Sequence, residues 1–387
     1  MSFHSAIRFA SYGGMYGCVP TGTVYPFFGR FARAGGRMGG KFPLFFAPKS
    51  LYTICSLFSG GSPMAQSTLP LSFAPLEGIT GWLFRRVHHS RFPGLARYYT
   101  PFSAPTADSP LTGRGLNDVL PEHNEGVPVV PQLLTNKADD FISAARCLQD
   151  LGYNEVNLNL GCPSGTVVSK KKGAGFLSDP QGIDAFLDTV FRRLDMTVSV
   201  KTRIGVSDPD EWPALLEMFA RYPISLLIIH PRLRTDYYKG DVRQEAFAYA
   251  VAKYKGPLCY NGDLNTVSDC QRVAACYPRL SELMAGRGLV ADPALGRALA
   301  GGPPLTQAEF LAFHDELVAG YQEILYGDWP VLGKMKELWT YWANLFPAPQ
   351  KPLKAMRKAK TLADYRAAVQ RLVGEQEIAS AGGGGIL

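Results

Sequence analysis

The chain has 387 residues, of which 46% are hydrophobic and 19% are charged. This composition excludes a disulfide-stapled mini-protein and a disordered chain, and the length allows one domain of about 250 residues with a smaller one. The formal net charge is +7, but residues 1–76 contain six Lys and Arg and no acid. Removing these six from the total of 40 leaves 34 basic against 33 acidic residues, so any affinity for nucleic acid must come from local patches.

Residues 1–66 are rich in Gly, Phe and Ser and follow neither a helical nor a strand period. An acid-free leader that contains Arg is compatible with a transit peptide, which would make the protein organellar. Alternatively, Met64 is the true start and the preceding residues are an extension without a fold. The Gly content favours the second interpretation, and with it a cytoplasmic protein. No apolar run reaches the ~20 residues of a membrane span, so no membrane association is predicted.

From residue 70 the chain alternates short β-rich runs with helical patterns, of which 137–151 and 180–194 are the clearest. Asp-Pro pairs at 179, 208 and 292 are predicted to begin helices, with Asp as N-cap and Pro in the first turn. Eight strands in about 230 residues predict a (β/α)8 TIM barrel over 70–303, whereas an open doubly wound sheet would favour GxGxxG after the first strand. The predicted strands are 71–74, 97–100, 129–133, 154–159, 197–201, 225–229, 257–260 and 281–285.

Polar or Gly-containing clusters follow nearly every predicted strand. Because the carboxyl ends of barrel strands meet on one face, these clusters predict an active site there. Gly262, Gly286 and Gly288 follow the last two strands and suit backbone N–H groups that approach an anion, although ordinary tight turns would also explain them. Arg287 and His230 would add donors, which favours a cofactor that carries a phosphate.

Lys201 ends a Val-rich strand, so its side chain is expected inside the barrel mouth. It either forms an ion pair with Glu77 or Asp263, or donates to an electron-rich ring or a phosphate, and we favour the second. Gln132 and Asn159 can each donate and accept hydrogen bonds, which suits the edge of a flat heterocycle and equally suits backbone groups at the barrel rim.

Cys162 lies in the loop after the fourth strand, in Gly161-Cys162-Pro163-Ser164. A thiol with a pKa near ~8.5 can donate a proton at neutral pH, and Lys170–Lys172 could depress that pKa or bind a polyanion. A nucleophilic role would need an adjacent base, and none is near in sequence, so a general acid is the better hypothesis. The seven cysteines form no CxxC pair and no zinc spacing, so no metal site is predicted.

Residues 306–375 are predicted to form a separate helical domain, followed by a flexible tail over 376–387. Residues 306–333 contain five acids and no Lys or Arg, whereas 334–371 contain nine basic residues and two acids. This basic half predicts a footprint for a nucleic-acid backbone, with a solvated helical face as the alternative. The cluster Lys351–Lys360 favours the footprint.

At these clusters the sequence resembles the tRNA-dihydrouridine synthase family, over about 71–295, and the C-terminal region resembles that family's helical domain. Leu76, Gly81 and Pro231 depart from the family's usual residues, which bears on loop geometry and subgroup. The motifs that carry the resemblance are APLEGITG (74–81), NLNLGCPSG (157–165), VKTRIG (200–205), IHPR (229–232), YNGD (260–263) and AGRG (285–288).

The resemblance implies an FMN-dependent barrel that uses NADPH to reduce the C5=C6 bond of selected uridines in tRNA. Hydride from reduced FMN would reach C6, Cys162 would give the proton to C5, and Asn159 would orient the uracil. The implied FMN contacts are Pro75, Leu76, Glu77, Gln132, Lys201, His230, Asn261, Gly262, Asp263, Gly286 and Arg287. The implied contacts to substrate or tRNA are Lys171, Arg203, Arg232, Lys354, Arg357 and Lys358.

Two other functions stay open. The first is an FMN-dependent oxidoreductase for a small dihydropyrimidine, which would have no need of the basic C-terminal helices and should survive deletion of 306–387. The second is an RNA-binding protein that has lost catalysis, against which Cys162 and Lys201 argue. The sequence leaves open which uridine is reduced, whether NADPH or NADH is preferred, and the oligomeric state, with which a monomer is compatible.

Overall fold

The computed structural model describes residues 69–111 and 113–379. The predictions for residues 1–66 and for most of the tail therefore lie outside the described residues. All the described residues belong to one compact unit. Within them, no helix is both long enough and apolar enough to cross a membrane.

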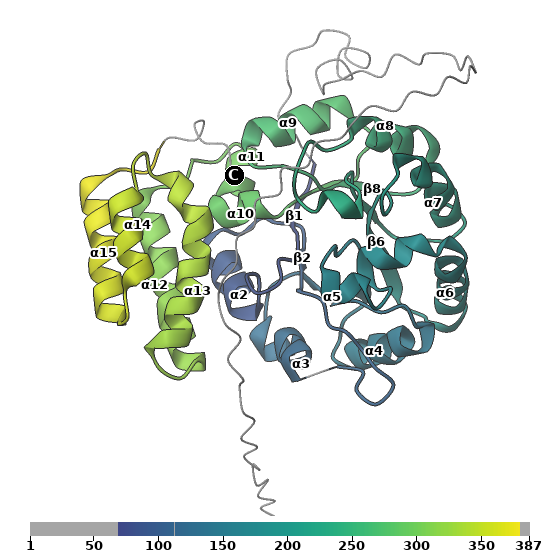
Figure 1. Cartoon of the computed structure of the whole chain (residues 1–387), viewed down its shortest axis with the longest axis horizontal. Helices are drawn as coiled ribbons and strands as arrows, with labels where there is room; N and C mark the ends of the chain where they lie inside the picture. The colour runs from purple at the N-terminus through teal and green to yellow at the C-terminus, as the bar shows by residue number, and fades with distance from the viewer. Residues whose placement is uncertain (1–68, 112, 380–387) are drawn as a thin grey trace, which may run out of the picture. The chain divides into compact units, whose positions relative to one another are not determined.

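A parallel sheet forms the predicted TIM barrel (Figure 1). The order of strands is β3-β2-β1-β9-β8-β7-β6-β5-β4, and β3 and β4 at its two ends are separated in the chain by Pro131 alone, so they close the barrel as one interrupted strand. Pro131 has no N–H to donate, which explains the interruption. The strands are β1 (Leu71–Phe73), β2 (Tyr98–Tyr99), β3 (Val129–Val130), β4 (Gln132–Leu133), β5 (Glu155–Leu160), β6 (Thr197–Arg203), β7 (Leu227–His230), β8 (Leu258–Tyr260) and β9 (Glu282–Ala285).

Helices connect the strands and cover the outside of the barrel. Asp179 caps α6 by accepting from Gly182 N at 2.9 Å, and Asp208 begins a 3-10 turn that leads into α7, as predicted. The prediction was wrong at Asp292, because its carboxylate accepts from Ala294 N and helix α11 begins only at Leu295. These helices are α2 (Trp82–Arg91), α3 (Gly113–Val119), α4 (Ala138–Asp150), α5 (Gly165–Val168), α6 (Pro180–Arg193), α7 (Trp212–Phe219), α8 (Gln244–Lys253), α9 (Val267–Cys276), α10 (Arg287–Ala291) and α11 (Leu295–Leu299).

The inside of the barrel is filled at its centre and at its amino end. A small apolar cluster that includes Tyr99, Ile228 and Met284 occupies the middle. At the amino ends of the strands, Glu282 accepts from Ser72 Oγ and forms an ion pair with Arg97. Side chains at the carboxyl end are therefore the ones left to shape a cavity.

Four further helices form the predicted C-terminal helical region: α12 (Gln307–Ile324), α13 (Asp328–Trp342), α14 (Gln350–Lys358) and α15 (Leu362–Glu375). Figure 1 shows them gathered beside the barrel, where α12 contacts α2 and α13 contacts α10. Trp342 Nε1 donates to Val290 O at 2.9 Å, and Lys334 Nζ donates to Gly78 O at 2.7 Å. The helical region is therefore bonded to the barrel next to its carboxyl end.

Candidate active site

A cavity of about 390 Å³ opens at the carboxyl ends of the barrel strands. It brings together residues that the chain holds more than 200 positions apart, from Pro75 to Arg287. Every predicted cofactor contact lines it, and so do both predicted catalytic residues and Arg203. The predicted residues found there are Pro75, Leu76, Glu77, Gln132, Asn159, Cys162, Lys201, Arg203, His230, Asn261, Gly262, Asp263, Gly286 and Arg287.

A chain of amide side chains runs along one wall of the cavity. Asn159 Nδ2 donates to Gln132 Oε1, and Gln132 Nε2 donates to Asn157 Oδ1, both at 2.7 Å. The other end of Asn159 accepts from the backbone N–H groups of Gly161 and Cys162, at 3.0 and 2.9 Å. Asn159 therefore fixes the loop that carries Cys162. The NH₂ groups of Asn159 and Gln132 each retain one proton that can be donated to a ligand.

Cys162 is half-buried at the cavity wall. Burial raises the pKa of its thiol above the ordinary value, and this outweighs the lowering by the Ser164 backbone and by the charge of Arg203. The thiol is therefore protonated at neutral pH, as a proton donor must be. Lys170–Lys172 do not lower the pKa of Cys162. The charged side chains that act on the thiol are Arg203, Glu77 and Lys201.

Lys201 projects from β6 into the cavity without a carboxylate partner among the described residues. Glu77 pairs with Arg114 at 2.9 Å, and Asp263 pairs with Arg232 and Arg287, so neither acid is available to it. Burial, with the neighbouring charge of Arg203, lowers the pKa of Lys201 to about 8. The ion pair that the sequence left open as the less favoured alternative is therefore absent from the described part of the chain, and the ammonium is directed at the cavity.

His230 ends β7 beside Lys201 and is buried. Burial, followed by the charges of Arg203 and Lys201, holds the pKa of His230 well below its ordinary value. The imidazole is neutral at physiological pH, so one ring nitrogen donates and the other accepts. Arg232 Nη1 lies 3.2 Å from His230 Nε2, which makes Nε2 the acceptor and leaves the Nδ1 proton to donate.

Asp263 organises the side of the cavity where the loops after β8 and β9 meet. It bonds Arg232 at 2.5 and 3.0 Å and Arg287 at 2.8 Å, and its own φ is +47°. The two loops are in close contact, because a Cβ on Gly288 would lie 2.2 Å from Leu264 O. Glycine is required at this position by packing, and the backbone of both loops is consequently held near the cavity.

Arg203 and Tyr238 form a further part of the cavity wall. The guanidinium of Arg203 donates to three backbone carbonyls, those of Gly161, Leu233 and Tyr237, at 2.9, 2.7 and 2.5 Å. The exposed ring of Tyr238 lies over it at 5.3 Å and over Arg287 at 5.8 Å. Arg203 thus ties the Cys162 loop to the loop after β7 and places an aromatic ring at the mouth.

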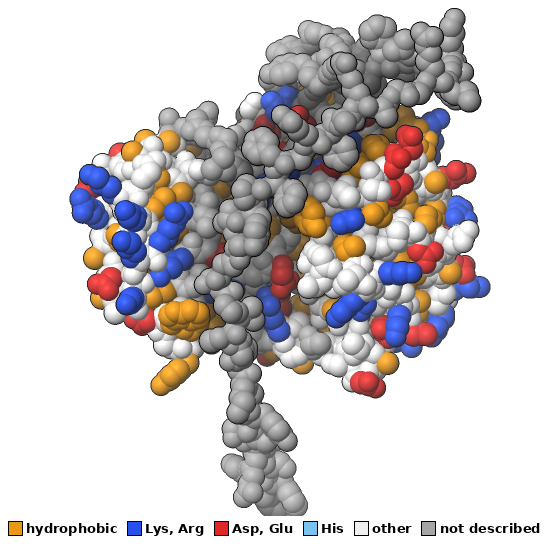
Figure 2. Space-filling view, viewed as in Figure 1, with side chains coloured by type: hydrophobic (Ala, Val, Ile, Leu, Met, Phe, Trp, Pro, Cys, Tyr) orange, Lys and Arg blue, Asp and Glu red, His pale blue; other side chains and the backbone are white. Residues whose placement is uncertain are grey.

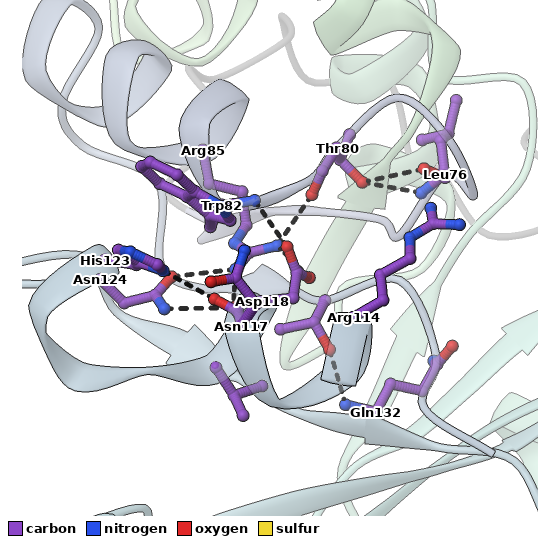
Figure 3. A network of polar contacts seen from close by, with 12 residues as sticks. Leu76, Thr80, Trp82, Arg85, Arg114, Asn117, Asp118, His123, Asn124 and Gln132 are labelled. Carbon is purple, nitrogen blue, oxygen red and sulfur yellow. Dashed lines mark hydrogen bonds and ion pairs between the residues drawn. The ribbon is translucent and has the colours of Figure 1, made fainter. Parts of the chain in front are cut away.

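A buried network holds α3, which carries Arg114, against the start of α2 (Figure 3). Arg85 donates to Thr80 O at 2.8 Å, to Asp118 Oδ2 at 2.9 Å and to Asn124 Oδ1 at 2.9 Å. Asp118 Oδ1 also accepts from Trp82 N at 2.7 Å. The network therefore fixes α3, and with it the exposed ion pair between Arg114 and Glu77, at the rim of the cavity. The carboxylate of Glu77 is directed toward α3.

Several predicted substrate contacts lie outside the cavity. Arg232 is 2% exposed and its guanidinium is bonded to Asp263 and to Gly240 O. Lys171 is exposed in the loop after α5. Lys354, Arg357 and Lys358 are exposed on α14. Their contacts with tRNA stay a prediction.

The residues that line the cavity without having been predicted from the sequence include Phe102, Tyr238, Glu337 and Tyr341. The aromatic pair in the loop after the predicted strand 225–229 was a usable signal for Tyr238. Glu337 and Tyr341 come from α13, and no local pattern could place that helix at the barrel mouth.

This chain is similar in sequence to a family of known proteins and shows a weaker structural likeness to others. The family model described as dihydrouridine synthase (Dus) matches residues 72–316. A tRNA-dihydrouridine(16) synthase of Pseudomonas putida is 28% identical over 260 residues, covering 64% of this chain and 79% of that protein. A probable tRNA-dihydrouridine synthase of Rhodobacter capsulatus is 28% identical over 310 residues, covering 77% and 94%. Among solved structures, morphinone reductase aligns with a TM-score of 0.42 and 13% identity, over 65% of this chain and 94% of that one.

Proposed function

This chain belongs to the dihydrouridine synthase family, and from that premise we propose that it is a tRNA-dihydrouridine synthase that uses FMN and NADPH. It is an oxidoreductase that reduces the C5=C6 bond of uridine in tRNA. The observation that carries the proposal is the pairing of a protonated thiol, Cys162, with an ammonium that has no carboxylate partner in the described chain, Lys201, in one cavity. A proton donor and a stabiliser of negative charge are what reduction of an electron-poor double bond requires.

The residues of the cavity fit FMN in size, charge and donor set. A volume of about 390 Å³ is within the range of small-molecule sites. Arg287 and the closely packed loops around Gly262 and Gly286 suit the phosphate, while Lys201 and Gln132 suit the polar edge of a flat ring. Asp263 is shared between Arg232 and Arg287, so this cluster of one acid and two guanidinium groups is net positive and suits an anion.

The proposed reaction takes place between the FMN ring and the wall that carries Cys162. Reduced FMN, when bound, supplies the hydride that C6 of the uracil receives. Cys162 Sγ–H gives its proton to C5, the C5=C6 π bond becomes two C–H bonds, and the thiolate recovers a proton from solvent. Lys201 and Arg203 lower the free energy of that thiolate by their charge. Asn159 holds the Cys162 loop and uses its remaining amide proton to orient the base.

The uridine must leave its stack to reach this cavity, because the atoms that react are otherwise covered by neighbouring bases. The exposed ring of Tyr238 at the mouth offers a surface for the extruded nucleotide. Since the relative from Pseudomonas putida is named for position 16, that uridine is the first to examine.

The test is NADPH-driven reduction of unmodified tRNA by the FMN-loaded protein, followed by digestion and quantification of dihydrouridine. We expect dihydrouridine with the wild type and a loss of about 10²- to 10⁴-fold in rate with Cys162→Ala. Cys147→Ala is the matched control, because Cys147 is a half-buried thiol on α4 outside the cavity.

Bound FMN that oxidises NADPH but leaves tRNA untouched would instead favour a small-molecule dihydropyrimidine reductase. Failure to bind FMN on reconstitution would remove the proposed chemistry altogether.

A further inference from the structure

The turn between α12 and α13 exposes two large aromatic rings. Tyr326 is 102% exposed and Trp329 is 84% exposed, and Ile324 beside them is 44% exposed. Neither ring contacts another aromatic ring or a cation among the described residues. Scattered exposed side chains are ordinary, but two bare rings three residues apart, one in the turn and one at the start of α13, bury little for the fold and suit a ligand.

Five cations on α14 and in the two residues after it lack ion pairs within the described chain, and the connection that follows α14 lies next to this turn. Asp328 Oδ2 accepts from Leu362 N at 2.8 Å and Lys336 Nζ donates to Ala359 O at 2.6 Å, so the connection between α14 and α15 is held against α13. Figure 2 shows Lys and Arg side chains over α14 and α15, and hydrophobic side chains at the end of this helical group. The exposed cations of α14 and the residue pair that follows it are Lys351, Lys354, Arg357, Lys358 and Lys360.

Bare aromatic rings at the end of a basic surface are the pattern of nucleic-acid binding, since cations hold phosphates and rings stack on bases. Two acids, Glu323 and Asp328, flank the rings and would repel a phosphate at that point. The rings therefore suit the face of an unstacked base, while the backbone of the same strand follows the cations of α14.

We propose that Tyr326 and Trp329 form a stacking platform for an unpaired nucleotide of the tRNA substrate, distant from the uridine that is reduced. The inference rests on the proposed function for the identity of the RNA. It adds a contact that fixes which way the tRNA lies across the helical region. Because each base has an aromatic face, the platform discriminates unpaired from paired nucleotides more than one base from another.

The test measures binding of an unmodified tRNA transcript to the full-length, FMN-loaded protein over a series of salt concentrations. We expect Trp329→Ala and Tyr326→Ala each to weaken affinity by about 5- to 100-fold without changing the salt slope, and Trp329→Phe to keep most of the affinity. Lys354→Gln should instead reduce the salt slope by about 0.9. Tyr249→Ala, an exposed ring on α8, is the matched control.

Fluorescence gives a readout that does not depend on activity. Trp212, Trp339 and Trp342 are buried and Trp82 is half-buried, so the difference between wild type and Trp329→Phe isolates the signal of the Trp329 indole. We expect tRNA to protect this signal from acrylamide. If wild type reduces tRNA but the aromatic variants bind it normally and acrylamide still reaches Trp329, the platform is excluded while the proposed function stands. Protection that depends on protein concentration without tRNA would assign the rings to self-association and overturn the inference.

Discussion

The two ends of the barrel use charge in opposite ways. At the amino end, Arg97 lies between Glu282 and Glu155 and Ser72 donates to Glu282, so each charged side chain of this group has an oppositely charged partner within the chain. At the carboxyl end, Lys201 has no carboxylate partner among the described residues, Arg203 donates to backbone carbonyls, and Arg232 and Arg287 share Asp263.

This difference separates groups that hold the fold from groups that await a ligand. A buried charge without a partner is costly, and proteins keep one where a ligand or a reaction uses it. At the amino end, the buried charges are compensated by partners within the chain. The carboxyl end leaves positive charge beside about 390 Å³ of cavity, and an anionic cofactor would complete it.

The largest effect is expected from removing the unpaired ammonium at the carboxyl end. Lys201→Met should lower the rate of tRNA reduction by about 10²- to 10³-fold, because a preorganised donor is lost from the reacting site. Stability should rise or stay constant, since burial already disfavours the charge of Lys201. Lys253→Met on α8 is the matched control. A destabilised Lys201→Met protein would mean that the ammonium holds the fold, as Arg97 does.

The same kind of change at the amino end should act on stability alone. Arg97→Met leaves Glu282 buried without its partner and should lower the free energy of unfolding by about 3 kcal/mol, the lower end for a broken buried pair because Arg97 is partly exposed. Denaturant unfolding measures this, and Glu282→Gln should cost less because it leaves no buried charge. Activity per folded molecule should not change. If Arg97→Met instead lost FMN binding without losing stability, Arg97 would act on the ligand, and the proposed difference between the two ends would be wrong.

Arg287 tests whether the charge at the carboxyl end is directed at the phosphate of FMN. Arg287→Gln removes one charge-assisted donor and should weaken FMN binding by about 10- to 100-fold. Fluorescence titration of the apoprotein with FMN measures this, with Arg192→Gln on α6 as control. If riboflavin, which lacks the phosphate, loses as much affinity as FMN, the guanidinium acts elsewhere on the ligand.

The position of this cavity could be predicted from the sequence because it follows from one geometric rule. Strands of a parallel barrel end on one face, so polar residues in phase with the strand ends, such as Lys201 and His230, must converge. The same reasoning could not say what each guanidinium does. Arg203 and Arg232 belong to strand-end motifs like the ligand-facing residues, yet their donors bond carbonyls and Asp263, which only the loop paths decide.

Contributions from far along the chain were beyond sequence reasoning. Glu337 and Tyr341 reach the cavity because α13 packs on α10, a contact between segments with no shared local pattern. For the same reason, deletion of 306–387 cannot distinguish a small-molecule substrate from tRNA. The deletion would remove Glu337 and Tyr341 from the cavity wall and so alter the site itself. The pKa of Cys162 was misjudged for the same reason, because Lys170 and Lys171 are near it in sequence but exposed to solvent.

The smallest predicted effect is a pH dependence that belongs to the carboxyl end only. The pKa of Lys201 is lowered to about 8, so its ammonium is charged below that pH and neutral above it. An anionic ligand prefers the charged form, so the Kd of the apoprotein for FMN should be constant from about pH 7 to pH 8 and then rise by at most about tenfold per pH unit. Lys201→Arg keeps its charge throughout and should remove the dependence, whereas Arg97→Met should leave it intact. A Kd that stays constant in the wild type to about pH 9.5 would mean that Lys201 does not interact with the ligand, and that the excess charge at this end resides in the arginines around Asp263.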